Sequence, residues 1–258
     1  MKEEIRNPWE GVKESDLYTK NDRSNVEVFN SKLGRHPKFI DLNLLPEPYM
    51  GNKNAKVILL FSNPGFGGNE TTEYNEIPKF KETIIKNLTH ANEEYPYYYL
   101  NPNFTRKSIK GETIFTDGGK WILDKTKQLR KDSGLTLEEF STKIFTLQLH
   151  PFHSAEFKAL NKTYKGYEYT MQLFSDSIDR AIKGEALIVC ARAYKEWNKE
   201  YQKLNNNDKS KDLKIDLNTN FVQMLHPRKL NFTPKHFGKD SEENDNYKKL
   251  ITELNKSL

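Results

Sequence analysis

The sequence predicts an α/β fold with three layers, α/β/α, around a central, mostly parallel sheet of about four strands. Two observations lead to this expectation. Short, continuously apolar runs recur along the chain, as is typical of strands buried on both faces. Segments of helical length lie between these runs, and such alternation is typical of a parallel sheet that helices cover on both sides. We expect the 258 residues to form a single domain.

The first predicted strand is the run Lys56-Val57-Ile58-Leu59-Leu60-Phe61, and three more are predicted at residues 143–149, 186–190 and 221–225. Residues 1–50 are expected to be an irregular N-terminal lead-in, because prolines are scattered through them, and residues 51–258 to be the α/β core. Helices are predicted at residues 79–91, 119–131, 169–182, 192–204 and 245–258.

Composition narrows the class of protein. The 41 Lys and Arg residues exceed the 36 Asp and Glu residues, which gives a net charge of +5. This excess is compatible with binding to phosphate groups of DNA, and equally with a lysine-rich surface. The single cysteine, Cys190, excludes a disulfide within the chain, a cysteine-based metal site and an iron–sulfur cluster.

Targeting signals are not evident. No stretch approaches the ~18 apolar residues of a membrane span, and the N-terminal residues lack the apolar core of a signal peptide. We therefore expect a cytoplasmic protein that does not contact a membrane.

The predicted loops after the strands bring polar residues to one edge. In an open parallel sheet, ligands bind beyond the carboxyl ends of the strands. Asn63-Pro64-Gly65 follows the first predicted strand, and His150 and His153 follow the second. His226 follows the fourth. These groups are predicted to form a site.

Two short motifs resemble those of the uracil-DNA glycosylase superfamily. The segment Phe61-Ser62-Asn63-Pro64-Gly65 resembles its first motif, which reads Gly-x-Asn-Pro-Gly in the mismatch-specific and single-strand-selective branches. Here Phe61 replaces the leading glycine. His226-Pro227-Arg228 resembles the second motif, which begins His-Pro-Ser in several branches, with Arg228 in place of serine. The resemblance spans roughly residues 44–235 in order and spacing.

The resemblance implies a monofunctional DNA glycosylase. Such an enzyme takes a nucleotide out of DNA and hydrolyses the N-glycosidic bond of uracil or another modified or damaged base, which leaves an abasic site. It implies that Asn63 positions the attacking water and that His226 hydrogen-bonds the leaving base or a flanking phosphate. The reaction is hydrolytic, so we expect no cofactor, and DNA is the expected partner of a monomeric protein.

Further site residues follow from the resemblance and from their place at the strand ends. The expected base pocket consists of Ser62, Pro64, Gly65, Phe66, Tyr99, Gln148, His150 and His153. The expected contacts to the DNA backbone are Ser154, Arg228 and Lys229. We expect no metal, because the His150 and His153 pair lacks an evident third ligand.

The resemblance does not identify the target base. Members of the superfamily often carry an asparagine near the second strand loop, where this chain has Gln148, His150, His153 and Ser154. Uracil, hypoxanthine, xanthine and a modified pyrimidine, such as a modified cytosine of phage DNA, are all candidates.

Two other classes of protein compete with a glycosylase. Gly65-Phe66-Gly67-Gly68 follows a strand and could cradle a phosphate, although it matches neither Gly-x-Gly-x-x-Gly nor a Gly-Lys-Ser/Thr loop. A nucleotide-binding α/β protein is therefore one alternative. A catalytically inactive DNA-binding relative is the other, because Phe61 and Arg228 depart from the family motifs.

Overall fold

The computed structural model describes residues 5–11, 13, 20–33, 36–92, 94–108, 110–158, 160, 165–225, 230–238 and 245–257. Its centre is a five-stranded sheet with the spatial order β1 (Tyr49–Gly51), β5 (Ile144–Gln148), β2 (Val57–Phe61), β6 (Leu187–Cys190) and β7 (Phe221–Gln223). Strand β2 pairs in parallel with β5 and β6, and β6 pairs in parallel with β7. Strand β1 runs antiparallel to β5.

The sheet differs from the prediction in two respects. All four predicted strands are present, as β2, β5, β6 and β7. The sheet nevertheless has five strands rather than about four, and it is mixed rather than mostly parallel, because β1 adds an antiparallel edge. The physical reason is the backbone of Tyr49–Gly51, which satisfies its hydrogen bonds on β5 despite the prolines before it.

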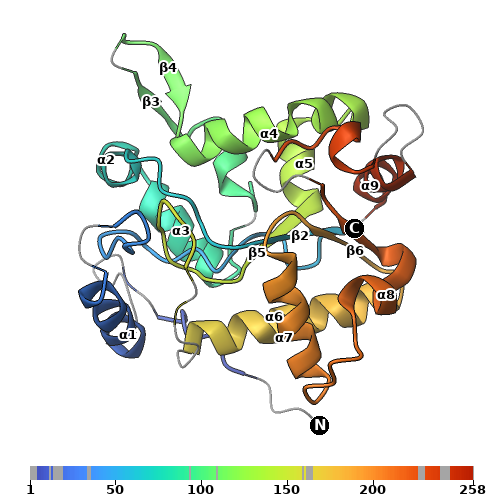
Figure 1. Cartoon of the computed structure of the whole chain (residues 1–258). Coiled ribbons are helices and arrows are strands. Elements are labelled where there is room, and N and C mark those ends of the chain that lie inside the picture. Colours follow the sequence, from blue (N-terminus) through green and yellow to red (C-terminus); the bar gives the residue numbers. More distant parts are fainter. Residues whose placement is uncertain are drawn as a thin grey trace.

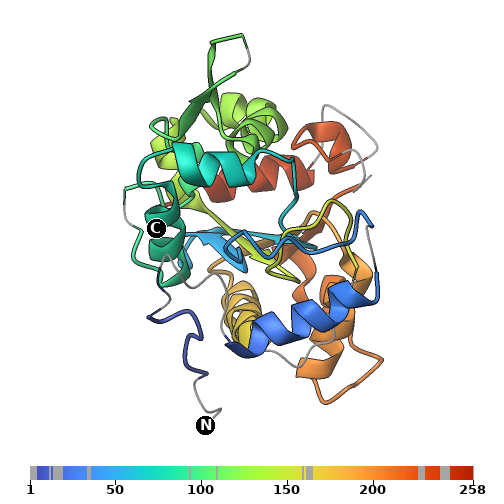
Figure 2. The ribbon, with the colours of Figure 1, turned by 90° about the vertical axis from the view of Figure 1, so that its left-hand side faces the viewer.

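Helices lie on both faces of this sheet (Figures 1 and 2), an arrangement compatible with a three-layer α/β fold. One face carries α4 (Asp117–Ser133), α5 (Leu137–Lys143) and α9 (Asp245–Leu254), and the other carries α6 (Lys165–Ile182), α7 (Tyr194–Leu204) and α8 (Leu213–Leu217). The short helices α2 (Glu70–Glu76) and α3 (Phe80–Leu88) pack together, and α3 contacts β1. None of the described helices combines the length and the apolar character needed to span a bilayer.

The N-terminal segment contains more regular structure than expected. Helix α1 (Lys20–Ser31) lies within residues 1–50 and packs against α6. Its buried residue Val26 contributes to a small apolar cluster with Ile40 and Phe152. A segment expected to be irregular therefore carries a helix that covers part of the lower layer (Figure 1).

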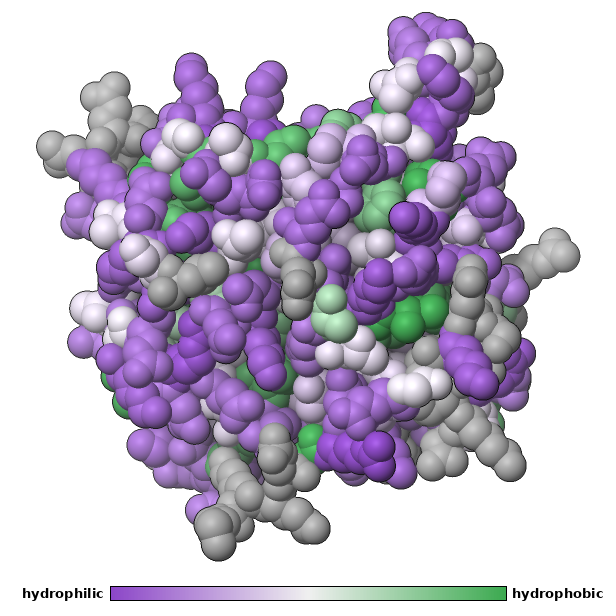
Figure 3. Space-filling model, turned by 180° about the vertical axis from the view of Figure 1, so that it is seen from behind, coloured by the Kyte–Doolittle hydropathy of each residue, from purple (hydrophilic) through white to green (hydrophobic). Residues whose placement is uncertain are grey.

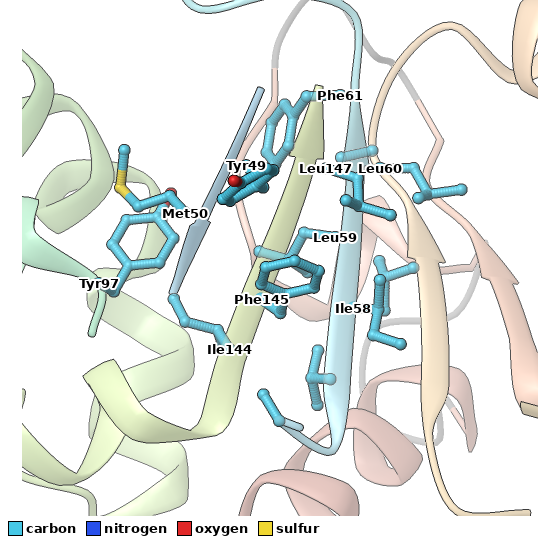
Figure 4. Close-up of a cluster of buried hydrophobic side chains, with 14 of the residues drawn as sticks. Tyr49, Met50, Ile58, Leu59, Leu60, Phe61, Tyr97, Ile144, Phe145 and Leu147 are labelled. Carbon is cyan, nitrogen blue, oxygen red and sulfur yellow. The ribbon is translucent and has the colours of Figure 1, made fainter. Parts of the chain in front are cut away.

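The core is built on the sheet. All five side chains of β2 are buried, as the continuous apolar run predicted. Figure 4 shows four of them, Ile58, Leu59, Leu60 and Phe61, beside side chains of β1 and β5 such as Tyr49 and Phe145. On α7, the buried Trp197 donates from Nε1 to the carbonyl of Phe61 at 3.0 Å. This bond ties α7 to the carboxyl end of β2, just before Asn63.

A separate two-stranded ribbon projects from the body of the molecule. It consists of β3 (Thr105–Lys107) and β4 (Thr113–Phe115), which pair antiparallel. Figures 1 and 2 show the ribbon rising beyond the N-terminal end of α4, and Figure 3 shows it as the protrusion at the upper right. The face in Figure 3 is largely hydrophilic, with small, separate apolar patches.

Candidate functional site at the carboxyl edge of the sheet

A cavity of about 310 Å³ opens at the carboxyl edge of the sheet. Its walls come from the loop after β2, from β1 and β5, from the segment that leads into η1 (Tyr98–Leu100) and from the start of α4. Its lining residues include Glu47, Asn63, Pro64, Gly65, Phe66, Tyr99, Trp121, Gln148, His153 and Arg192. A cavity of this size suits a small organic ligand such as a single base.

Asn63 is half-buried on this cavity and its amide group is held on both sides. Its Nδ2 donates to the carbonyl of Pro64 at 2.8 Å and to the carbonyl and hydroxyl of Ser154 at 3.2 and 3.1 Å. Its Oδ1 accepts a hydrogen bond from Ser62 at 3.1 Å. Because an amide oxygen has two lone pairs, Oδ1 can still accept a hydrogen bond from a water.

A buried carboxylate and imidazole form a second polar group of the cavity. Glu47 and His153 are only 3% and 2% exposed, and His153 Nε2 lies 3.4 Å from Glu47 Oε1. The hydroxyl of Tyr99 donates to the same oxygen at 2.8 Å. His153 Nδ1 lies 2.8 Å from the carbonyl of Gly65, which fixes the ring against the loop after β2.

These contacts change the pKa values of His153 and Tyr99. Burial disfavours the imidazolium of His153, but the carboxylate of Glu47 and the carbonyl of Gly65 outweigh burial, so that the pKa of His153 is raised. Burial also raises the pKa of Tyr99 well above its ordinary value, and the neighbouring Glu47 raises it further. Tyr99 therefore keeps its proton and remains a donor to Glu47.

Aromatic rings form much of the remaining wall. Phe61 and Trp121 meet edge to face with ring centroids 5.8 Å apart. The ring of Tyr99 lies directly on Gly118, where a Cβ would overlap it. Phe66 is 37% exposed on the loop after β2, so that its ring is available at the cavity. Flat rings of this kind are suited to stacking on a base.

In the glycine-rich loop of residues 65–68, the amides that could bind a phosphate already donate to a side chain of the protein. Glu70, at the start of α2, accepts hydrogen bonds from the amides of Gly67 and Gly68 at 2.5 and 2.8 Å. A phosphate cradle would need these amides for its ligand. The carboxylate of Glu70 occupies the position of the anion, which argues against phosphate binding by this loop.

An ionic cluster connects the cavity to the projecting ribbon. Arg106 of β3 donates from Nε to Glu73 at 3.1 Å and from Nη2 to Asp117 at 2.9 Å. Asn69 donates to Asp117 at 2.7 Å. Asp117, the first residue of α4, also lines the cavity. The cluster therefore holds the N-terminus of α4 and the ribbon in fixed positions beside the cavity.

The structure brings most of the sequence-predicted site residues together. The predicted residues that line the cavity are Asn63, Pro64, Gly65, Phe66, Tyr99, Gln148 and His153. Ser62 is buried behind them and bonds Asn63. The predicted residues His226, Arg228 and Lys229 lie outside the described residues.

Two predicted residues lie elsewhere or act differently. His150 is buried, does not line the cavity and has its ring 5.3 Å from that of Phe157. Ser154, expected to contact the DNA backbone, is buried and donates to the carbonyl of Glu156 at 3.0 Å while it accepts from Asn63. Ser154 therefore supports Asn63 from inside the protein, because its hydroxyl is engaged on both sides.

The cavity residues that were not predicted from the sequence include Glu47, Trp121 and Arg192. Glu47 reaches the site because β1 is antiparallel, which places the residues before β1 at the carboxyl edge. Trp121 points from α4, where its position indicated only core packing. Arg192 lies two residues after the end of β6, and its placement in a strand-end loop was the available signal. Its Nε is buried without a hydrogen-bond partner among the described residues.

Metal binding receives no support from the described residues, among which no group of three or more His, Cys, Asp or Glu side chains is arranged to hold an ion. Comparison of the chain with protein-family models, with curated proteins and with solved structures finds no match. The case for a function therefore rests on the residues of the cavity and on the resemblance of the short motifs.

Proposed function

We propose that the protein is a DNA glycosylase that hydrolyses the N-glycosidic bond of a base held in the cavity at the carboxyl edge of the sheet. The observation that carries the proposal is the immobilised amide of Asn63 on that cavity. With Nδ2 anchored on Pro64 and Ser154, Oδ1 is held in place to orient a water toward a sugar at the cavity. Orientation of this kind lowers the barrier without proton removal by the amide.

The cavity also offers groups for the departing base. In the transition state of this hydrolysis, positive charge develops on the sugar and negative charge on the departing base, before water adds to the sugar and the base is protonated. Arg192 supplies a cation whose Nε has no hydrogen-bond partner in the described part of the chain, and Phe66 and Tyr99 supply rings for stacking. A base inside a duplex does not reach such an enclosed position, so the nucleotide must be flipped out or already single-stranded.

The competing classes of protein are less consistent with these contacts. A nucleotide-binding protein would use the amides of Gly67 and Gly68 for phosphate, and Glu70 already accepts from both. An inactive DNA-binding relative has no need of an amide held by four hydrogen bonds at the cavity. Base release distinguishes the remaining possibilities.

The proposal is tested by incubation of the protein with oligonucleotides that carry different bases, followed by alkaline cleavage of abasic sites. We expect cleavage with at least one substrate, and its loss in Asn63→Ala. That variant should lose about 1–3 kcal/mol of stability, since buried acceptors lose their donor. Asn220→Ala is the matched control, because Asn220 also donates to a main-chain carbonyl, that of Ala181, yet does not line the cavity.

The outcomes separate clearly. Cleavage that disappears in Asn63→Ala and persists in Asn220→Ala supports a glycosylase with Asn63 at its centre. Full activity of a folded Asn63→Ala variant contradicts the role given to Asn63. DNA binding without release of any base favours the inactive relative.

A further inference from the structure

The cavity contains a fixed hydrogen-bond acceptor that the function so far leaves unused. Glu47 lies in the segment before β1, is 3% exposed and lines the cavity. Its backbone is also held, because its amide donates to the carbonyl of Pro151 at 2.7 Å. Both the main chain and the side chain of Glu47 are thus anchored, which makes its carboxylate a rigid feature of the wall.

The carboxyl group of Glu47 is held by its neighbours in the wall of the cavity. A buried carboxylate is costly unless other groups hydrogen-bond it or neutralise it. Tyr99 donates to Oε1 at 2.8 Å, and His153 Nε2 lies 3.4 Å from the same atom. A carboxylate has about four lone-pair sites. Tyr99 and His153 therefore both contact Oε1, and the carboxylate, which lines the cavity, has further lone-pair sites that can accept from a ligand.

Gln148 adds a second polar group to the same cavity. It is the last residue of β5, and its Oε1 is buried without a hydrogen-bond partner among the described residues. An amide both donates and accepts, so Gln148 can adapt to either kind of base atom, whereas a carboxylate can only accept. Of these two residues, Glu47 is therefore the one that can discriminate between donor and acceptor atoms of a base.

The hydrogen-bonding edges of the bases differ in what they offer to an acceptor. Uracil presents two carbonyl oxygens on either side of a single N–H group. Cytosine and adenine present an exocyclic amino group beside a ring nitrogen. Carboxylates accept from the amino group of cytosine in known protein–DNA contacts. The same carboxylate repels the carbonyl oxygens of uracil, and this repulsion is strong where water is excluded.

We propose that Glu47 selects a base with an exocyclic amino group, of the cytosine or adenine type, and selects against uracil. Glu47 accepts a hydrogen bond from the amino group, while Gln148 pairs with the adjacent ring atoms. Tyr99 and His153 hold the carboxylate in place. This inference rests on the proposed glycosylase function, since it names the substrate class of the same cavity.

The experiment compares base release from otherwise identical single-stranded oligonucleotides that carry one cytosine, 5-hydroxymethylcytosine, adenine or uracil. We expect release of an amino-bearing base to exceed release of uracil by about ten- to a hundredfold. Comparison of the cytosine and adenine substrates shows which of the two types of amino-bearing base the protein releases. In Glu47→Gln, the new amide can donate to a carbonyl oxygen, so the ratio should move at least about tenfold toward uracil.

A buried glutamate elsewhere provides the control. Glu200 is 2% exposed on α7, bonds Tyr167 and Lys203, and does not line the cavity. Glu200→Gln should leave the ratio of amino-bearing base to uracil unchanged. If Glu47→Gln does not fold, Tyr99→Phe serves instead, because it removes the hydroxyl that holds Glu47 and should reduce the same ratio.

Failure of this inference is distinguishable from failure of the proposed function. Release of uracil in preference to every amino-bearing base, abolished by Asn63→Ala, would overturn the role of Glu47 and retain the glycosylase. Without release from any substrate, binding of free cytosine, adenine and uracil to the wild-type protein, measured by NMR titration, decides the matter. Binding of uracil as tight as that of both amino-bearing bases would then overturn the inference.

Discussion

Gly118 is a single residue whose missing side chain shapes the cavity. It is the second residue of α4, and a Cβ there would overlap the ring of Tyr99. Tyr99 in turn holds Glu47 through its hydroxyl. The close approach of helix and ring therefore positions both an aromatic wall and a carboxylate.

We predict that Gly118→Ala displaces Tyr99 and weakens base binding. Overpacking of this kind costs about 1–3 kcal/mol, so thermal unfolding should occur at a lower temperature. Lys120→Ala, at an exposed position of the same helix, is the control and should affect neither property. Base release and thermal melting of both variants check the prediction, and a fully stable, active Gly118→Ala variant would contradict it.

Glu73 is a buried residue whose titration makes the stability of the protein depend on pH. Its side chain is 1% exposed, and burial raises its pKa to about 7 from an ordinary value of 4.5, even though the amide of Asp117 and the side chain of Arg106 donate to it. The folded protein therefore holds this proton more tightly than the unfolded chain. The resulting stabilisation is complete below the unfolded pKa and is lost as the pH rises through the folded pKa.

We predict that the stability of the wild type relative to Glu73→Gln falls on the order of 2 kcal/mol between about pH 5 and pH 8. Glutamine cannot titrate, and its oxygen can accept the same hydrogen bonds. Urea unfolding of both proteins across this range measures the difference. A difference that is constant with pH would show that Glu73 does not titrate there.

At the scale of elements, the β3–β4 ribbon depends on its anchor. Two-stranded ribbons are marginally stable on their own, and this one is tied to the body by Arg106, which contacts Glu73 and Asp117. The side chain of Arg106 is only 15% exposed, so these charge-assisted bonds are shielded from water. The orientation of the ribbon beside the cavity therefore follows from one arginine.

We predict that Arg106→Ala loosens the ribbon. Hydrogen exchange of the amides in Thr105–Lys107 and Thr113–Phe115 should become faster, and the protein should lose about 1–3 kcal/mol, because Glu73 and Asp117 each lose a hydrogen-bond donor. Lys107→Ala is the matched control on the same strand, since Lys107 makes one exposed bond to Thr113. Unchanged exchange in Arg106→Ala would mean that other contacts hold the ribbon.

The sequence predicted long or strongly apolar elements better than short ones. Strand β2 was readable because all of its side chains are apolar and buried. Strand β1 has only three residues and follows two prolines, so local patterns did not favour a strand. Its pairing with β5 depends on tertiary structure, which is also why Glu47 could not be assigned to the site in advance.

Helix α5 was missed although its sequence contains a recognisable start signal. Thr136 accepts from the amide of Glu139, and Glu139 accepts from the amide of Thr136, which together form a capping box. We predict that Thr136→Ala lowers stability by about 1 kcal/mol without effect on base release. Chemical denaturation checks the first part, and a loss of release in a folded variant would contradict the second.

At the scale of the whole molecule, the α/β alternation was sufficient to bring the functional residues to one edge. Parallel strands that end together place the residues after them side by side, and Asn63, Gln148, His153 and Arg192 meet there. The alternation of strands and helices does not predict whether a given side chain points into the cavity or into the protein interior. Ser154 and His153 are one residue apart in the chain, yet one supports Asn63 and the other holds Glu47.

The net charge of the whole chain bears on how strongly DNA binding should depend on salt. The net charge of +5 is a small difference between 41 basic and 36 acidic residues, so DNA would be held by few phosphate contacts. Each neutralised phosphate of a single strand contributes about −0.7 to the slope of log binding constant against log salt concentration. We predict a slope between about −1.5 and −4 for the Asn63→Ala variant on a single-stranded oligonucleotide.

Fluorescence anisotropy at several salt concentrations measures this slope. The uncleaved complex of Asn63→Ala allows equilibrium binding to be followed without base release. An oligonucleotide with uncharged methylphosphonate linkages is the control and should bind more weakly, with little dependence on salt. A slope near zero on the charged strand would mean that phosphates contribute nothing, and it would leave a free base or nucleoside as the ligand of the cavity rather than DNA.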